Sequence, residues 1–247
     1  MKNIAFIPAR LASSRFPNKV LADIHGKTML QCVFDGIQNC GFDEVYITTC
    51  DNKIIDVAAS FGASSILTSN KHERCLDRVA EAYSHLSQKY DSDNIYCIQG
   101  DEPMTHPNMI TEAVSPMLKD SEIIVTNLLG DIKSQDEFED RNCIKVVCDL
   151  DGNALCFSRE PIPTRMFGEV TMKKQVCIIP FTRDFLLEYT KLSPTPLEIF
   201  ESIDMMRILE HGKKVKMIPT NFHTHPVDTE DDLLRVESLI SQMKNNE

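Results

Sequence analysis

The chain has 247 residues, of which 42% are apolar and 26% charged, an ordinary globular composition that excludes a disordered or fibrous protein. The net charge of −11 argues against binding to nucleic acid or to an anionic membrane surface, because both are polyanions. No apolar run approaches the roughly 18 residues of a membrane-spanning helix, so we also expect no membrane span.

Nine cysteines are spread along the chain, an odd number without a Cys-x-x-Cys pair. Most lie in apolar runs, as Cys97 does between Tyr96 and Ile98. We therefore expect buried free thiols and neither a disulfide framework nor a zinc site. The segment Met1–Arg10 is typical of a strand and not of a signal peptide. Together these features predict a protein of the reducing cytoplasm.

Short apolar runs alternate with stretches of helical period through the first hundred residues. The apolar runs predict strands at residues 4–7, 44–49, 65–67 and 95–98. The periodic stretches predict helices at about 28–39, 53–61 and 75–86. This order implies parallel strands joined by right-handed crossovers, the doubly wound α/β arrangement. Ligands of such sheets bind beyond the carboxyl ends of the strands.

The pattern changes after Leu128. Residues 130–141 are acidic and predict a loop. Apolar runs predict strands at 144–148, 154–157 and 176–181, which would form a mixed extension to the sheet at about 130–182, with a hairpin turn at Asp151-Gly152. Helices are expected at about 183–190, 197–211 and 231–243, and a strand at 215–218. Because no linker or repeat is found, we predict a single domain of residues 1–247.

A group of cations follows the first predicted strand. Residues 1–30 contain one acid, Asp23, against Lys2, Arg10, Arg15, Lys19 and Lys27. Arg binds phosphate oxygens in pairs and Lys acts as a point charge, so cations at a strand's carboxyl end favour a polyphosphate ligand. A solvated basic loop is the alternative. Neither GxxxxGK[ST] nor GxGxxG occurs, which removes the main support for a Walker-type NTPase or a Rossmann dinucleotide site.

Two acids, Asp101 and Glu102, lie just beyond the strand predicted at 95–98. Carboxylates at a strand end either bind a metal or cap the next element. Mg²⁺ typically takes one or two protein carboxylates plus substrate phosphates, so a second acid is expected from elsewhere. Asp228 is the best candidate, with a simple N-cap as its alternative, and Thr229 is expected to cap the last helix.

Two weaker patterns favour structural roles. His223 and His225 have ligand-like spacing but no third ligand, so we expect surface histidines. Met205 and Met206 fall in a helix of apolar period, which predicts core packing.

Six segments together have a recognisable pattern. They are Ile7-Pro8-Ala9-Arg10 with the following Ser13–Lys19, Gln99–Pro103, Ile144–Val147, Phe157-Ser158-Arg159, Pro196-Leu197-Glu198 and Val227-Asp228-Thr229. In this order, over nearly the whole chain, they resemble the 3-deoxy-manno-octulosonate cytidylyltransferases (CMP-Kdo synthetases). The resemblance implies a GT-A-like nucleotidyltransferase fold with a mostly parallel, mixed sheet. It also implies CTP, Mg²⁺, a role in lipopolysaccharide biosynthesis and, usually, a homodimer.

The same resemblance implies roles for individual residues. Residues implied to hold the triphosphate are Arg10, Ser14, Arg15 and Lys19. Gln99 and the backbone of Pro8 and Ala9 would read the cytosine, and Arg78 would also contact nucleotide. Asp101 and Asp228 would ligate Mg²⁺, and the catalytic set would be Lys19, Arg15 and Asp101. Residues implied to face the sugar acid are Arg159, Gln175 and Glu198.

Some positions depart from the family pattern. The family's HxSGT[DE]R segment is His72–Arg78 here, with Arg74-Cys75-Leu76 in place of Ser-Gly-Thr. Its HxGIYGY strand becomes Gln175–Phe181, a family glutamine is Met205, and a family glycine is Asn18. Most of these changes lie where the family holds its sugar, so the nucleotide half of the site is better supported than the acceptor half.

We therefore predict an enzyme that transfers CMP from CTP to a Kdo-like 3-deoxy-keto-sugar acid and releases pyrophosphate. One alternative keeps the chemistry but changes the acceptor to a nonulosonate or to a phosphorylated or phosphonate alcohol. Another is a nucleotide-binding protein without transferase activity, suggested by the lost Ser-Gly-Thr. A GT-A glycosyltransferase is weaker, because its DxD acids are missing from the strand end.

Overall fold

The computed structural model describes residues 2–13, 15–86, 93–168 and 170–245. The chain forms two compact units. The first unit consists of Met1–Asn108 and His223–Glu247, and the second unit of Met109–Phe222. Among the described residues, no helix has both the length and the apolar character needed to cross a membrane.

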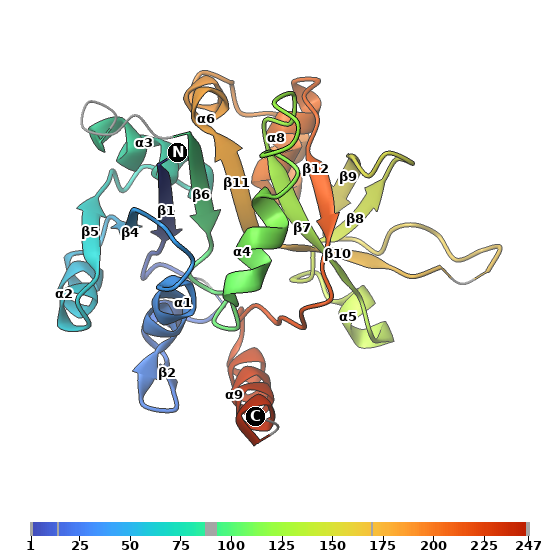
Figure 1. The fold of residues 1–247 in the computed structure, drawn as a ribbon. Coiled ribbons are helices and arrows are strands. Elements are labelled where there is room, and N and C mark those ends of the chain that lie inside the picture. The colour runs from blue at the N-terminus through green and yellow to red at the C-terminus, as the bar shows by residue number, and fades with distance from the viewer. Residues whose placement is uncertain (1, 14, 87–92, 169, 246–247) are drawn as a thin grey trace. The chain divides into compact units, whose positions relative to one another are not determined.

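The first unit is built on parallel strands, as predicted. They are β1 (Asn3–Pro8), β4 (Glu44–Thr49), β5 (Ser64–Leu67) and β6 (Asn94–Ile98). They lie side by side in the order β6-β1-β4-β5 (Figure 1). All residues from Ile4 to Ile7 are fully buried, which accounts for the uninterrupted apolar run of β1. The doubly wound arrangement is confirmed here.

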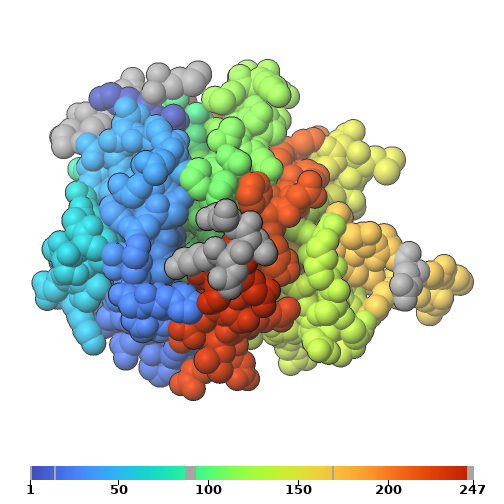
Figure 2. Space-filling model, turned by 60° about the horizontal axis from the view of Figure 1, so that its bottom comes forward, coloured from blue at the N-terminus to red at the C-terminus, as the bar shows by residue number. Residues whose placement is uncertain are grey.

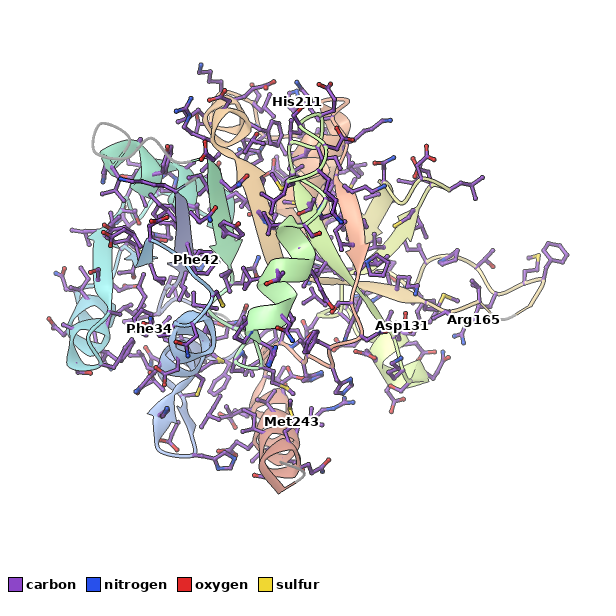
Figure 3. The ribbon with its side chains drawn as sticks, viewed as in Figure 1. Phe34, Phe42, Asp131, Arg165, His211 and Met243 are labelled. Atoms are coloured by element: carbon purple, nitrogen blue, oxygen red, sulfur yellow. The ribbon has the colours of Figure 1, made fainter. Side chains whose placement is uncertain are left out.

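Helices follow the first three of these strands. They are α1 (Met29–Ile37), α2 (Asn52–Ser60) and α3 (Cys75–Leu86), all within two residues of the predicted bounds. The Oγ1 of Thr28 caps α1 by accepting from the N–H of Gln31. Phe34 on α1 packs against Phe61, and Phe42 packs against Tyr96 on β6, with ring centroids 5.4 and 4.9 Å apart. Figure 3 labels Phe34 and Phe42.

Short elements before α1 were not predicted. They are a 3-10 turn η1 (Lys19–Leu21) and the antiparallel strands β2 (Asp23–Ile24) and β3 (Lys27–Thr28). His25 and Gly26 join β2 to β3 with positive φ angles of 52° and 86°, and two residues of this kind make a tight hairpin. Strands of two residues are too short to give an alternating pattern.

The last helix, α9 (Glu230–Asn245), returns to the first unit. Figure 2 shows it in red beside blue residues from the start of the chain, and the ring of His25 lies 3.0 Å from the carbonyl oxygen of Glu237. The Oγ1 of Thr229 accepts from the N–H of Asp232 at 3.2 Å, which confirms Thr229 as the cap of this helix.

The second unit has a five-stranded sheet of its own, in the order β12-β7-β10-β8-β9. Its strands are β7 (Thr126–Asp131), β8 (Lys145–Cys148), β9 (Ala154–Ser158), β10 (Lys173–Val176) and β12 (Lys216–Pro219). Among its described pairs, β12 and β7 are parallel and the others antiparallel, so this sheet is mixed as predicted. It is a separate sheet, however, and not the predicted extension of the first one. The strands β8 and β9 form the expected hairpin through Gly152, whose φ is +78°.

Helices of the second unit lie along its strands and loops. They are α5 (Gln135–Glu139), α6 (Arg183–Tyr189), α7 (Pro196–Glu201) and α8 (Asp204–Glu210). A further helix, α4 (Pro107–Val114), begins in the last two residues of the first unit's first segment and continues into the second unit. The helix α4 was not predicted. Met205 and Met206 on α8 are buried, which confirms their core role.

Three predictions for the second unit were wrong. Residues 130–141 are not a loop, because β7 runs to Asp131 and Ser134 caps α5 through the N–H of Glu137. The strand predicted at 176–181 is two strands, β10 and β11 (Ile178–Thr182), separated at Cys177. The helix predicted at 197–211 is broken by Ser202, which has a φ of 58° and ends α7.

All nine cysteines are free thiols, as expected. Cys97 and Cys143 are buried and the other seven are partly exposed, so the expectation of buried thiols was wrong for most of them. Several lie on strands with one face only partly covered, as Cys148 and Cys156 do on β8 and β9. Burial raises the pKa of the Cys143 thiol to about 12, which keeps this thiol unreactive at neutral pH.

Candidate active site

Three segments of the first unit meet at the side chain of Lys19. Its Nζ donates to Oδ2 of Asp101 and Oδ1 of Asp228, each at 2.8 Å, and to the carbonyl oxygen of Val227 at 3.0 Å. The side chains of Lys19, Asp101 and Asp228 are 13%, 22% and 13% exposed. The predicted meeting of the first loop with two distant aspartates is therefore present in the structure.

The charges of this cluster balance. Burial alone would lower the pKa of Lys19, but the carboxylates of Asp101 and Asp228 outweigh it and raise that pKa above its ordinary value. The ammonium is thus charged at any physiological pH. Nη2 of Arg15 also donates to Oδ1 of Asp228 at 2.9 Å, so two cations offset two carboxylates. Arg15 is 46% exposed, so part of its guanidinium faces solvent.

The loop before Lys19 folds back on itself. The N–H of Asn18 donates to the carbonyl of Leu11 at 3.1 Å, and the N–H of Leu11 donates to Oδ2 of Asp51 at 2.8 Å. Asn18 has a left-handed backbone, with φ 59° and ψ 21°. Among non-glycine residues Asn tolerates this region well, which explains how Asn18 stands where the family has glycine.

The ends of β1 and β6 approach each other closely. A Cβ added to Gly100 would lie 3.0 Å from the carbonyl oxygen of Pro8, so only glycine fits there without a shift. The N–H of Ala9 donates to the carbonyl of Thr48 at 2.9 Å. This bond occupies the N–H of Ala9, and Pro8 has no N–H. Gln99 is half-buried at the same strand end.

Hydrogen bonds also fix the chain segment around Asp228. The N–H of Val227 donates to the carbonyl of Asp101 at 3.0 Å, which ties the two acid-bearing segments together. His225 was predicted on the surface but is 8% exposed, because its Nε2 lies 2.8 Å from Oδ1 of Asp232. His223 is exposed, as predicted.

The Asp232 carboxylate has an unusual pKa. Burial alone would raise this pKa, but hydrogen bonds with His225 and Thr229 and from the amide of Asp228 lower it to about 2. Neither Asp232 nor the Val227 carbonyl was predicted to belong to the site. Both lie close to Asp228 in the sequence. This closeness could have indicated the segment, but it does not predict which hydrogen bonds the segment forms.

The predicted nucleotide ligand Arg78 is buried, with 3% exposed. Its guanidinium donates to Oγ1 of Thr68 at 2.5 Å and to the carbonyls of Ser69 and His72 at 3.3 Å. In this arrangement Arg78 shapes the loop that follows β5. Arg10 is exposed on the first loop, and Ser14 lies outside the described residues.

Two of the residues predicted to face the acceptor have partners within the second unit. The Glu198 carboxylate, 1% exposed, accepts from Nε and Nη2 of Arg207 at 2.7 and 2.6 Å. Gln175 donates from Nε2 to Oδ1 of Asn127 at 2.6 Å. These contacts place Glu198 and Gln175 in the packing of the unit.

Arg159, the third such residue, is anchored to backbone. Its Nε, Nη1 and Nη2 donate to the carbonyls of Glu201, Arg141 and Ser202 at 2.7, 2.8 and 3.3 Å. Its own carbonyl accepts from Nζ of Lys145 at 2.6 Å. The guanidinium therefore has a fixed direction.

The Lys19 cluster suits a hard divalent cation. Oδ2 of Asp101 and Oδ1 of Asp228 both face one cationic nitrogen at 2.8 Å, and carboxylate oxygens are the ligands that Mg²⁺ prefers. Within the described parts of the chain, no three His, Cys, Asp or Glu side chains group closely enough to hold a metal. Two carboxylates alone fit a Mg²⁺ that arrives with substrate phosphates.

The sequence profile of the cytidylyltransferase family matches residues 4–215. A 3-deoxy-manno-octulosonate cytidylyltransferase of Geobacter metallireducens is 38% identical, over 99% of this chain and 100% of the relative. One from Synechococcus elongatus is 40% identical, over 97% of this chain and 98% of the relative.

Solved structures show the same fold. A structure described as CMP:2-keto-3-deoxy-manno-octonic acid synthetase complexed with CTP superposes with a TM-score of 0.86 at 33% identity, covering 98% of this chain and 100% of its own. A 4-diphosphocytidyl-2C-methyl-D-erythritol synthase of Anaerococcus prevotii has a TM-score of 0.62 at 13% identity, covering 97% and 99%. The second likeness concerns the fold alone, and both agree with the predicted nucleotidyltransferase fold.

Proposed function

Because the chain belongs to the 3-deoxy-manno-octulosonate cytidylyltransferase family, we propose that it transfers CMP from CTP to 3-deoxy-manno-octulosonate and releases pyrophosphate. The observation that carries the proposal is the cluster of Lys19, Asp101 and Asp228 at the ends of β1 and β6. This is the edge of a parallel sheet at which ligands bind.

The reaction makes one bond and breaks one. The oxygen of the acceptor's anomeric hydroxyl attacks the α-phosphorus of CTP, and the bond between that phosphorus and the oxygen bridging to the β-phosphorus breaks. Pyrophosphate leaves with the bonding electrons, and the hydroxyl proton passes to solvent. Little covalent chemistry falls to the protein, so rate enhancement comes from positioning and charge neutralisation.

The residues of the first unit supply that charge. Lys19 and Arg15 would bind the triphosphate and offset the negative charge that builds on the leaving pyrophosphate. Asp101 and Asp228 would hold Mg²⁺, which when bound polarises phosphate oxygens and the attacking hydroxyl. Arg10, Ser14 and Gln99 are proposed as further nucleotide contacts.

In the second unit, Arg159 is proposed to face the carboxylate of the sugar acid. Its backbone anchors at Glu201, Arg141 and Ser202 fix the direction of the guanidinium, a planar cation that suits a carboxylate. Gln175 and Glu198 would act through the packing that they stabilise. A homodimer and a cytoplasmic location remain predictions.

Pyrophosphate release tests the proposal. Purified protein with Mg²⁺ and CTP is given Kdo, a nonulosonate or a phosphonate alcohol, with UTP replacing CTP in a parallel set. We expect release with CTP and Kdo together, and at most a few per cent of that rate without either. Release with another acceptor but not Kdo would keep the enzyme class and change the substrate. Tight CTP binding without release from any acceptor would contradict transferase activity.

A further inference from the structure

Asp228 lies on a stretch of chain that no regular element supports. Residues 221–228 form neither helix nor strand, and α9 begins only at Glu230. The direction of the Asp228 carboxylate therefore depends on the few hydrogen bonds that fix its backbone. In an unsupported segment, losing one such bond allows the carboxylate to point elsewhere.

The carboxylate of Asp232 supplies the decisive bonds. Its Oδ2 accepts from the N–H of Asp228 at 3.1 Å, and from both the N–H and the Oγ1 of Thr229 at 2.8 Å. Its Oδ1 lies 2.8 Å from Nε2 of His225. The side chains of Asp232 and His225 are 15% and 11% exposed, so these bonds are largely shielded from water.

Capping of α9 does not account for all of these contacts. The cap consists of the reciprocal bonds between Thr229 and Asp232, in which the N–H of Asp232 donates to Oγ1 of Thr229 and Oδ2 of Asp232 accepts from the N–H of Thr229. The bond to the N–H of Asp228 and the contact with His225 lie outside this cap. Both join Asp232 to the segment that carries the site.

We propose that Asp232 is a positioning residue for the cation site: through the backbone N–H of Asp228 it holds the Asp228 carboxylate facing Lys19 and Asp101, and His225 holds Asp232 in turn. The inference rests on the proposed function, in which Asp228 is a metal ligand. Asp232 reaches the site through the backbone N–H of Asp228 and therefore acts through another residue.

Binding of Mn²⁺ in the presence of CTP, followed by electron paramagnetic resonance on the full chain, tests this role. We expect Asp232→Ala to weaken Mn²⁺ affinity at least tenfold. Asp232→Asn retains a carbonyl oxygen that accepts from the N–H of Asp228, so we expect a loss below threefold. His225→Ala leaves the cap intact and should weaken Mn²⁺ binding by an intermediate factor.

Thr28→Ala is the matched control. Thr28 caps α1 in the same unit through the N–H of Gln31 and, within the described part of the chain, has no hydrogen bond to Lys19, Asp101 or Asp228. It should lower the unfolding temperature as losing a cap does, with Mn²⁺ affinity unchanged. If Asp232→Ala behaves like Thr28→Ala, Asp232 is only a helix cap and the inference is wrong.

Asp228→Ala separates this inference from the proposed function. If Asp228→Ala abolishes Mn²⁺ binding while Asp232→Ala and His225→Ala leave it unchanged, only the positioning role fails. If Asp228→Ala itself leaves Mn²⁺ binding unchanged, the metal site of the proposed function is misplaced, and the positioning role is refuted with it. Should Asp232→Ala fail to fold, the intermediate loss in His225→Ala decides the question.

Discussion

The Nζ of Lys19 lies 2.8 Å from Oδ1 of Asp228, although the two residues are 209 positions apart in the chain. The same nitrogen lies 2.8 Å from Oδ2 of Asp101. One ammonium thus separates two carboxylates that would otherwise repel each other. This contact links the stability of the first unit to the chemistry that we assign to it.

Replacing Lys19 with methionine should cost both stability and activity. The two aspartates would lose their shared ammonium while partly buried, so we expect about 3 kcal/mol less free energy of unfolding, near the lower limit for broken buried ion pairs. Urea unfolding measures this loss, and saturating Mg²⁺ should restore part of it. The value of kcat/KM for CTP should fall about 100-fold or more, the scale of losing one transition-state donor.

Lys27→Met is the control for this variant. Lys27 pairs with Asp35 at 2.7 Å, but the side chains are 53% and 39% exposed. An exposed pair of this kind contributes at most about 1 kcal/mol. Equal effects of Lys19→Met and Lys27→Met on unfolding would show that the Lys19 cluster is an ordinary surface contact.

Asp101→Asn should abolish turnover and preserve the fold. The amide is similar in size, and Lys19 keeps Asp228 as a partner, so the circular dichroism spectrum should be unchanged. The loss of one anionic ligand should reduce CTP-dependent pyrophosphate release below detection. Asp56→Asn, an exposed position on α2, serves as the control. A near-normal rate in Asp101→Asn would remove Asp101 from the proposed metal site.

Acid should destabilise the first unit through Asp232. The pKa of this carboxyl is about 2 in the folded chain against an ordinary 3.8, so its contribution to stability is present above about pH 4 and is lost as pH falls towards 2. The difference corresponds to about 2 kcal/mol. We expect the stability gap between the wild-type chain and Asp232→Ala to narrow by that amount between pH 5 and pH 2. A gap independent of pH would contradict the assignment.

The left-handed backbone of Asn18 predicts opposite results for two small substitutions. Asn18→Ala places an ordinary side chain at φ 59°, which should cost about 1 kcal/mol of unfolding free energy. Asn18→Gly adopts this conformation freely and should retain wild-type stability and activity. Thermal unfolding distinguishes the two variants. If both behave alike, backbone strain at residue 18 is unimportant.

The first unit was the more predictable from sequence. Three of its parallel strands, β1, β4 and β6, are mostly buried runs of five or six residues, and parallel strands place their carboxyl ends at one edge. From this rule the sequence predicts that Lys19 and Asp101 lie at the same edge of the sheet. Asp228 was found because it precedes a capped helix, although its bonds to Lys19 and Arg15 join segments that no local pattern relates.

The second unit was less predictable because single residues interrupt its patterns. Apolar period continues across Ser202, so one left-handed residue divides a helix that periodicity predicts as continuous. The pairing of Glu198 with Arg207 likewise depends on how α7 and α8 pack. The burial of His225 could not be predicted, because its partner Asp232 lies on the next helix. The spacing of His223 and His225 does not indicate this contact.

The discontinuous first unit has a consequence for protein synthesis. The first unit cannot be completed until the segment from His223 onward has been synthesised, because only this segment supplies Asp228 as a partner of Lys19. A nascent chain that ends before residue 228 carries the basic loop and Asp101 but lacks the other acid. Prematurely terminated chains should therefore be inert and not partly active, and translation must pass this point before any nucleotide is consumed.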